Sequence, residues 1–231
     1  MSGVGRYIYA LGYWNHVLYQ YDTTTGKSKR VVVGSVGQHV SRNFVADVRG
    51  HVYVPRLTAQ ADGKVTAALV EYDADLHEVG ATSLEFYTGR ESPGSNEGIV
   101  GLAYLSDGRI VFTTHRGQLY LIDPIRSGPA QVTPVGWLHP KGEAYAPSLF
   151  SFNGKSLLAS VTQRDGAYEW VIFDLATGIS GAFPLDTKKL RNVLLYGSIT
   201  RDNEGRFYVG GWAAEPVGGE RPLVLQITAS P

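Results

Sequence analysis

Short apolar runs recur along the chain, and four of them end in an aspartate that is followed by a turn. The four segments are VLYQYDTTTGK (17–27), ALVEYDADLHE (68–78), LYLIDPIRSG (119–128) and WVIFDLATGI (170–179). Their aspartates are Asp22, Asp73, Asp123 and Asp174, at intervals of 51, 50 and 51 residues. A fifth copy, LVLQIT (223–228), places Thr228 in the aspartate position. The pattern predicts a chain built from repeats about 50 residues long.

A second series of segments interleaves with the first. It comprises DVRGHVYV (47–54), LSDGRIVF (105–112), FNGKSLLA (152–159) and DNEGRFYV (202–209), preceded by the apolar runs NFVAD, GLAYLSD, LFSFN and YGSITRD. An Asp or Asn followed closely by Gly between apolar runs is typical of a β-hairpin, because the turn requires a positive φ. Weaker strands are expected at SKRVVVG (28–34), AQVTPVGW (130–137) and SGAFPL (180–185).

Four strands in each period of about 50 residues are typical of the blades of a β-propeller. A blade is a small sheet with two apolar faces, and it buries both only between neighbouring blades. We therefore expect an all-β protein with a single propeller domain over residues 1–231. Its repeats run approximately over 1–35, 36–87, 88–137, 138–185 and 186–231. The alternative is a β-sandwich in which the spacing is a coincidence.

The count of strands predicts about 4.5 to 5 blades rather than a complete set. When the strands of a blade are labelled A to D from the inside outward, the chain opens with strand B (6–11) and closes with strand C (223–228). This count lacks the inner strand of the first blade and the outer strand of the last. We expect a section of a larger ring of about six to eight blades, with an irregular five-bladed ring as the alternative.

The composition narrows the classes of partner. Basic and acidic residues balance at 21 each without long like-charge runs, so we expect neither nucleic acid nor a membrane as a partner. No signal segment and no apolar stretch of transmembrane length is visible, which predicts a soluble chain of undetermined compartment. Cysteine is absent, which excludes disulfides, thiolate metal sites and a cysteine nucleophile.

The strand assignment sorts the loops onto two ends of the blades. The A–B and C–D turns are short, whereas the B–C and D–A loops are long, and long loops on a rigid scaffold commonly carry binding residues. Arginine and histidine beside aromatic rings suit a polar or anionic organic ligand. The predicted ligand-binding residues of this long-loop end are Trp14, His16, Arg42, Arg56, Asn96, Arg116, Tyr145, Arg164 and Trp212.

Three further residues form the candidate catalytic set, namely His39, Glu97 and His115. A histidine near a carboxylate is the usual pair for general acid–base work, provided that the three side chains converge. The alternative is that each is an exposed polar group of a loop. Arg56, Arg116 and Arg164 each follow strand B of successive repeats, so they are either a ring of arginines or ordinary solvated loop ends.

Other polar residues have a structural interpretation. The aspartates at the strand ends are expected to accept backbone N–H groups in the turns that follow. His51 and His77 are expected near the short turns, where they are structural or solvated. Trp14 and Trp212 either line the pocket or close a core between blades.

The repeats resemble the superfamily of YVTN-type, streptogramin-lyase-like and SMP-30/gluconolactonase-like propellers. The resemblance is carried by the D-x-x-G copies at 47–54 and 202–209 and by the strand ends YDTTTGK and FDLATGI. Kinship with SMP-30-like enzymes implies a divalent metal held by Glu, Asn and Asp, and kinship with streptogramin lyases implies a metal and a general-base histidine. Neither set matches residue by residue, so no catalytic role is carried over.

The function expected from the sequence is a binding module that holds a small polar ligand or a protein partner at the long-loop end, over the central axis. The alternative is a propeller hydrolase or lyase that acts on a small polar or anionic substrate through His39, Glu97 and His115. A divalent metal is the one cofactor left open for that alternative.

Overall fold

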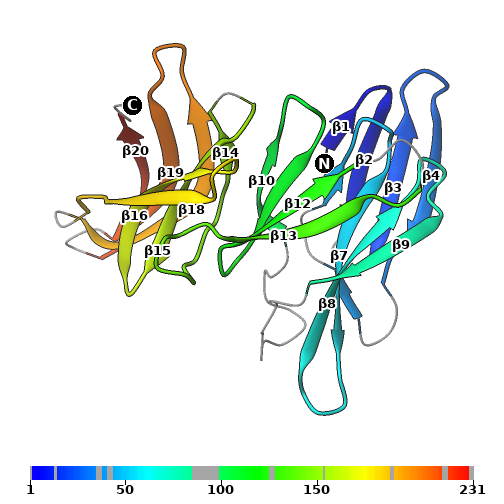
Figure 1. The fold of residues 1–231 in the computed structure, drawn as a ribbon, viewed down its shortest axis with the longest axis horizontal. Coiled ribbons are helices and arrows are strands. Elements are labelled where there is room, and N and C mark those ends of the chain that lie inside the picture. The colour runs from blue at the N-terminus through cyan, green and yellow to red at the C-terminus, as the bar shows by residue number, and fades with distance from the viewer. Residues whose placement is uncertain are drawn as a thin grey trace. The chain divides into compact units, whose positions relative to one another are not determined.

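The computed structural model describes residues 2–12, 15–34, 38–40, 44–84, 99–124, 128–152, 154–187, 190–214 and 218–228. The regular elements of these residues are β-strands, arranged in five antiparallel sheets that follow one another along the chain (Figure 1). No helix suited to crossing a membrane occurs in these ranges.

Each sheet is a meander in which consecutive strands lie side by side. Sheet 1 contains β1 (Ser2–Val4), β2 (Tyr7–Gly12), β3 (Val17–Asp22) and β4 (Lys27–Val32). Sheet 2 contains β5 (Gln38–Val40) and β6 (Val45–Ala46), both paired with β7 (Val52–Ala59), and then β8 (Val65–Tyr72) and β9 (Glu78–Ser83). Sheet 3 contains β10 (Ile99–Tyr104), β11 (Ile110–Thr114), β12 (Gln118–Asp123) and β13 (Gln131–Trp137).

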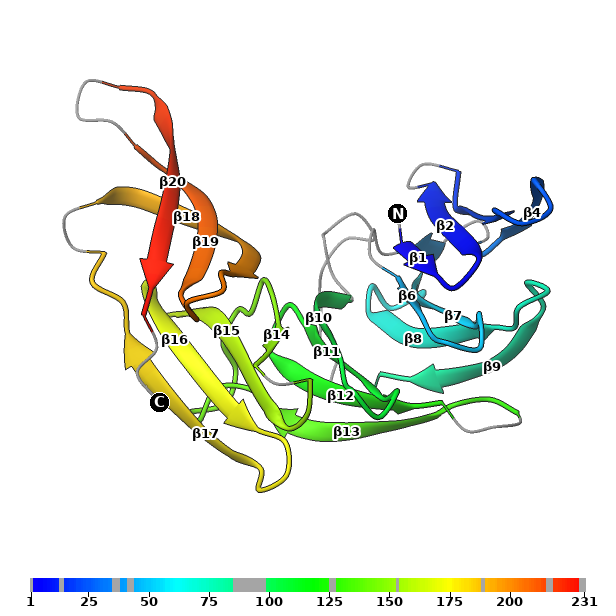
Figure 2. The same ribbon diagram turned by 90° about the horizontal axis from the view of Figure 1, so that it is seen from above.

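The last two sheets differ in their number of strands. Sheet 4 contains β14 (Phe150–Ser151), β15 (Leu157–Arg164), β16 (Ala167–Asp174) and β17 (Ile179–Pro184). Sheet 5 contains β18 (Arg191–Arg201), β19 (Phe207–Ala214) and β20 (Glu220–Ile227), which lie side by side in Figure 2. Within the described residues the last sheet thus has three strands.

One expectation at the start of the chain is wrong. The first repeat does have an inner strand, because Ser2–Val4 pairs with Tyr7–Tyr9 to form β1. Three residues without an apolar alternation give no recognisable strand pattern, and only pairing with β2 makes them a strand. The inner strand of the second repeat is not one continuous strand. It consists of two short strands, β5 and β6, which pair separately with β7.

The predicted turns after Asp22, Asp73 and Asp174 are confirmed, whereas the turn after Asp123 lies largely outside the described residues. The backbone N–H groups of Thr24, Asp75 and Ala176 donate to the side chains of Asp22, Asp73 and Asp174. The bond from Ala176 is the main cause that lowers the pKa of Asp174 below its ordinary value. In the other series, Gly50 and Gly205 adopt φ of 82° and 84°, which a residue with a Cβ rarely adopts.

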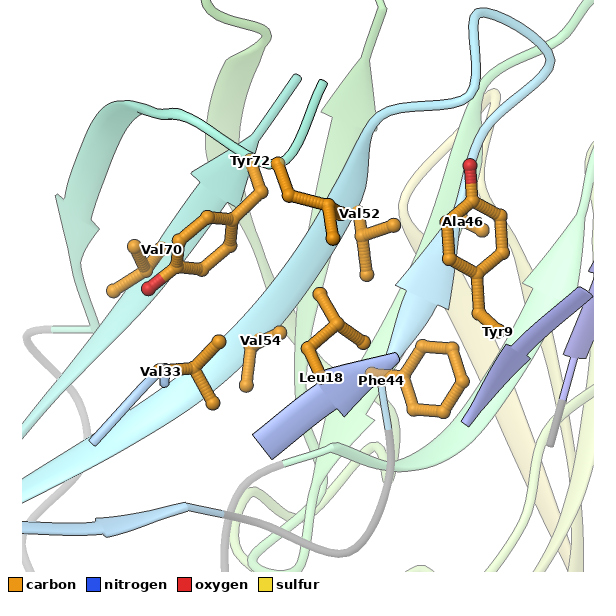
Figure 3. Packing of buried hydrophobic residues seen from close by; sticks show 10 residues of the cluster. Tyr9, Leu18, Val33, Phe44, Ala46, Val52, Val54, Val70 and Tyr72 are labelled. Atoms are coloured by element: carbon orange, nitrogen blue, oxygen red, sulfur yellow. The ribbon is translucent and has the colours of Figure 1, made fainter. Parts of the chain in front are cut away.

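The chain forms two compact units. Unit 1 comprises residues 1–99, 107–110 and 120–134, and unit 2 comprises residues 100–106, 111–119 and 135–231. The apolar core of unit 1 lies between sheets 1 and 2 (Figure 3). Tyr9 and Leu18 of sheet 1 face Val52, Val54 and Tyr72 of sheet 2 there. Sheet 2 thus covers the apolar face of sheet 1, as the repeat pattern predicts.

Unit 1 also contains a buried polar network at the turn between β6 and β7. The Asp47 carboxylate accepts hydrogen bonds from the backbone N–H of Arg49 (2.8 Å) and of His51 (3.1 Å). It also accepts from the Arg49 Nε (2.8 Å) and from the Tyr53 hydroxyl (2.8 Å). The Glu71 carboxylate lies 2.9 Å from Arg49 Nη2 and 2.7 Å from His51 Nδ1. Burial, followed by the Asp47 charge, raises the pKa of Tyr53.

The same network holds the segment that leads into β13. The second Glu71 oxygen accepts the backbone N–H of Ala130 at 2.6 Å, and Arg49 Nη1 donates to the carbonyl of Gly128 at 3.1 Å. The polar groups of this network are therefore partnered although they are removed from water, which is the condition under which buried charges are tolerated.

The core of unit 2 lies between sheets 4 and 5. Phe207 of β19 is fully buried at its centre, and its ring centroid lies 4.9 Å from that of Phe152. The rings of Phe150 and Trp170 each lie 5.0 Å from Phe207. These edge-on and tilted contacts are the favoured geometries for aromatic pairs, and through them Phe207 joins sheet 5 to sheet 4.

Candidate functional site

Three segments of unit 2 meet at the long-loop end of sheets 3 and 4. They are the turn 114–118, the connection 138–147 and the turn 163–168. The Ala144 and Ala146 N–H groups donate to the carbonyls of Arg116 (3.1 Å) and His115 (3.3 Å). Tyr145, between them, exchanges two backbone bonds with Gln163, at 2.9 and 2.8 Å. Residues 144–146, called the 144–146 bridge below, thus tie the two turns together.

Gly117 makes this close approach possible. Its N–H donates to the carbonyl of Thr114 at 2.9 Å and its φ is 82°. A Cβ at this position would lie 2.6 Å from the carbonyl oxygen of Ala144, a distance that carbon and oxygen do not tolerate. The glycine therefore sets both the tight turn and the packing of the 144–146 bridge against it.

The two arginines beside the bridge have polar partners. Arg116 forms a two-point ion pair with Glu143 through its Nε and Nη2 atoms. Arg164 Nη1 donates to the carbonyl of Lys141 at 2.6 Å, and its Nε lies 3.4 Å from the carboxylate of Asp165. Both arginines that the sequence singled out in this unit are thus neutralised locally.

A buried histidine of the connection 138–147 pairs with a carboxylate of β16. His139 is fully buried, and its Nε2 lies 2.7 Å from the Glu169 carboxylate. The Lys141 backbone N–H donates to His139 Nδ1 at 3.1 Å, so Nδ1 is an acceptor and the ring proton is on Nε2. The imidazole donates to Glu169 and fixes the path of the connection.

His115 and Tyr145 give the site its chemical character. Burial is the main cause that lowers the pKa of His115 to about 4, and the charge of Arg116 lowers it further against the opposing effect of Glu143. His115 is therefore a neutral imidazole at neutral pH. Tyr145 is 42% exposed, and partial burial of its phenol raises its pKa. The site thus combines a half-exposed tyrosine, whose backbone is held by hydrogen bonds, with a neutral histidine whose ring nitrogens are buried.

The shift of His115 predicts how stability depends on pH. The unfolded chain takes up a proton at an imidazole pKa of about 6.5, whereas the folded protein does so only at about 4. Between these values the unfolded state binds more protons, so the free energy of unfolding should fall as the pH falls. His115→Gln is expected to flatten this dependence. Urea unfolding of wild type and variant at about pH 7 and about pH 5 measures it, and parallel curves would contradict it.

The remaining predicted residues lie elsewhere or outside the described residues. His16 lies in the turn between β2 and β3, and Arg56 of β7 forms a two-point ion pair with Glu78 of β9, at 3.1 and 3.2 Å. His39 belongs to β5, where its backbone pairs with Leu57. Trp212 of β19 pairs with Pro222 and points to the opposite face from Val209. The predicted residues outside the described ranges are Trp14, Arg42, Asn96 and Glu97.

The structure therefore brings together four of the predicted residues, His115, Arg116, Tyr145 and Arg164. The catalytic set of His39, Glu97 and His115 stays a prediction, as does the arginine ring, since Arg56 belongs to the other unit. Within the described residues, no three His, Cys, Asp or Glu side chains are grouped as a metal site.

Comparison with known proteins identifies the fold alone. No protein-family model and no curated protein matches the sequence. The solved structure of the dihydro-heme d1 dehydrogenase NirN in complex with DHE matches with a TM-score of 0.54 and 16% identity, over 98% of this chain and 45% of that one. The Dos1 propeller matches with a TM-score of 0.52 and 13% identity, over 91% and 55%. The fold is a β-propeller.

The five sheets are the blades predicted from the repeats, and the chain spans about half the length of these two propellers. The periplasmic gluconolactonase PpgL of Pseudomonas aeruginosa matches with a TM-score of 0.45 and 16% identity, over 97% of this chain and 70% of that one, which is too weak to support an inference. The resemblance is thus confirmed at the level of the propeller fold, and the narrower family stays a prediction.

Sequence reasoning missed Glu143, His139 and Glu169, which complete the site. Glu143 and His139 belong to the connection between the third and fourth blades, and their partners belong to other strands and turns. No spacing along the chain signals such pairs. The only available signal was the unusual length of the connection, which marked it as a binding loop.

Proposed function

We propose that the chain is a non-catalytic binding module that holds a protein partner at the 144–146 bridge of unit 2. The observation that carries the proposal is that Tyr145, a half-exposed aromatic residue, has a backbone held in place by hydrogen bonds. Backbone bonds to Gln163 and those of its two neighbours to Arg116 and His115 hold it from both sides. An aromatic side chain on a fixed backbone has few bonds left to order on binding, so it is a suitable anchor.

The charges around Tyr145 favour a protein surface over a pocket for a free anion. Arg116 already has Glu143 as a counter-ion, so an anion at this arginine would have to compete with that carboxylate. Paired charges around an exposed tyrosine are the composition of an interface rim around an aromatic anchor.

The neutral state of His115 favours binding over catalysis. A general base is most effective when its pKa lies near the working pH, and burial lowers the pKa of His115 to about 4. An imidazole in this state accepts a proton poorly at neutral pH. The hydrolase or lyase alternative would therefore have to rely on other groups, with His39 and Glu97 as its candidates.

Tyr145→Ala tests the proposal. The residue is 42% exposed, so the variant should keep the fold, while removal of an interface anchor costs about 2 kcal/mol of binding, or roughly 30-fold in affinity. Wild-type and variant protein are used as baits in quantitative affinity purification, and the recovered protein is then titrated against both baits by isothermal calorimetry.

Tyr21→Ala is the matched control, because Tyr21 is 44% exposed but lies next to the short turn that Asp22 begins. A partner that is lost with Tyr145→Ala and kept with Tyr21→Ala supports the proposal. Equal recovery with both variants contradicts it. A thermal shift caused by a small polar compound and lost in Tyr145→Ala would instead support the small-ligand expectation.

A further inference from the structure

The side chain of Tyr145 lies in a row with two others across sheet 4. Tyr145 forms an antiparallel bridge with Gln163, and Gln163 of β15 lies opposite Tyr168 of β16. Residues that lie opposite each other in antiparallel strands turn their side chains to the same face. Tyr168 belongs to the core between sheets 4 and 5. The three residues, called the tyrosine–glutamine row below, therefore lie on the face of sheet 4 that packs on sheet 5.

The row leads from the packed interior to the solvent. Tyr168 is buried, and its hydroxyl donates to the carbonyl of Val193 at 3.1 Å and accepts the N–H of Leu195 at 3.3 Å. Gln163 is partly buried, and Tyr145 is 42% exposed. After partial burial, the charge of Tyr168 is the second cause that raises the pKa of Tyr145, so the two phenols lie near each other. Exposure thus increases along the row from Tyr168 to Tyr145.

The backbone around Tyr145 offers no edge to an added strand. The N–H and the carbonyl of Tyr145 both bond to Gln163. On the other side, the N–H groups of Ala144 and Ala146 donate to carbonyls of the turn 114–118. This segment therefore has bonded neighbours on both sides, whereas strand addition requires a row of unpaired main-chain groups. A partner at Tyr145 has to be recognised by side chains.

Two side-chain groups of the row are available for that recognition. Among the residues that the structure describes, neither the Gln163 carboxamide nor the Tyr145 hydroxyl has a hydrogen-bond partner. Both groups are uncharged donors, and the charge of the neighbouring Arg116 is already balanced by Glu143. The row thus suits an uncharged ligand that combines apolar rings with carbonyl acceptors.

We propose that the tyrosine–glutamine row holds a proline-rich segment of the protein partner in the polyproline II conformation, an inference that rests on the function proposed above. This conformation has no internal hydrogen bonds, so its carbonyls are free to accept, and proline has no N–H that would need a partner. A proline ring packs on the exposed ring of Tyr145, while the Gln163 carboxamide and the Tyr145 hydroxyl donate to carbonyls of the segment. Because this conformation is formed before binding, the segment loses little entropy.

The test uses a fluorescein-labelled peptide of roughly ten prolines, which forms about three turns of the polyproline II helix. Its binding to the full chain is measured by fluorescence anisotropy. We expect saturable binding that Tyr145→Ala weakens roughly tenfold or more, because the aromatic contact is lost. Gln163→Leu keeps the size of the side chain but removes its donor, and it is expected to weaken binding roughly fivefold, the usual effect of one lost hydrogen bond.

Gln131→Leu is the matched control, because Gln131 is an exposed residue of β13 in unit 1 and its substitution should leave the affinity unchanged. A glycine–serine peptide of the same length is the control ligand. It offers carbonyls without proline rings and is expected not to bind. Circular dichroism establishes that each variant folds, and Gln163→Glu, which also lacks the donor, replaces Gln163→Leu should that variant unfold.

The outcomes separate this inference from the proposed function. Absence of saturable binding of the proline peptide overturns the inference, as does an affinity that either Tyr145→Ala or Gln163→Leu leaves unchanged. Equal binding of the glycine–serine peptide also overturns it. The affinity purification with Tyr145→Ala decides the proposed function independently. A partner that is recovered through Tyr145 and is not displaced by the proline peptide supports that function and contradicts the inference.

Discussion

Asp47→Asn is expected to lower the free energy of unfolding of unit 1 by about 3 kcal/mol, which corresponds to a melting temperature lower by roughly 10 °C. The Asp47 side chain is fully buried, and its carboxylate accepts from Arg49, from Tyr53 and from two backbone N–H groups. An amide offers one acceptor fewer and loses the charge that the buried part of Arg49 requires. Thermal unfolding followed by circular dichroism measures the effect.

Asp202→Asn is the matched control, since the fifth repeat contains the same motif at a position that is more exposed to solvent. Asp202 accepts from the Glu204 and Arg206 N–H groups, both at 2.9 Å, and from the Tyr208 hydroxyl at 2.9 Å. Its side chain is 25% exposed, so water can replace lost bonds. The loss should be clearly smaller than for Asp47→Asn, and equal losses would show that burial does not decide the contribution of this motif.

Phe207→Ala is expected to destabilise unit 2 by about 3 to 4 kcal/mol. The ring is fully buried between sheets 4 and 5, where it contacts Phe150, Phe152 and Trp170. Its removal loses the burial of the ring and leaves a cavity that three other rings cannot fill without moving. Urea unfolding monitored by tryptophan fluorescence provides the measurement.

Phe183→Ala supplies the comparison for this prediction. The substitution is chemically identical, but Phe183 is 54% exposed on β17, so its loss should cost less than about 1 kcal/mol. A large loss of unfolding free energy in Phe183→Ala together with a small loss in Phe207→Ala would contradict the assignment of Phe207 to the core of unit 2.

The architecture could be predicted because its determinants are local. Asp22, Asp73 and Asp174 each accept hydrogen bonds from backbone groups of the residues that immediately follow. Gly50 and Gly205 adopt a positive φ in turns that the Asp–Gly sequence pattern predicts. The strand β1 escaped prediction because its three residues become a strand only through pairing with β2. Sequence patterns describe what a segment prefers, and short inner strands are decided by their neighbours.

The candidate site could be predicted only in part, because its contacts join residues that are distant in the sequence. The loop lengths led to Arg116, Tyr145 and Arg164, which the structure does bring together. The partners of these residues depend on how consecutive blades pack. The Arg116–Glu143 pair spans 27 residues, and the His139–Glu169 pair spans 30. The periodic pattern of apolar and polar residues does not predict such pairs.

The self-contained turns of the repeats have an evolutionary consequence. Each turn aspartate accepts hydrogen bonds from the few residues that follow it. A duplicated repeat therefore contains all the residues that its own turn requires. Tandem arrays of this kind can gain or lose whole modules by recombination without new compensating substitutions elsewhere. Divergence is then concentrated in the segments that join one module to the next, where new recognition properties arise.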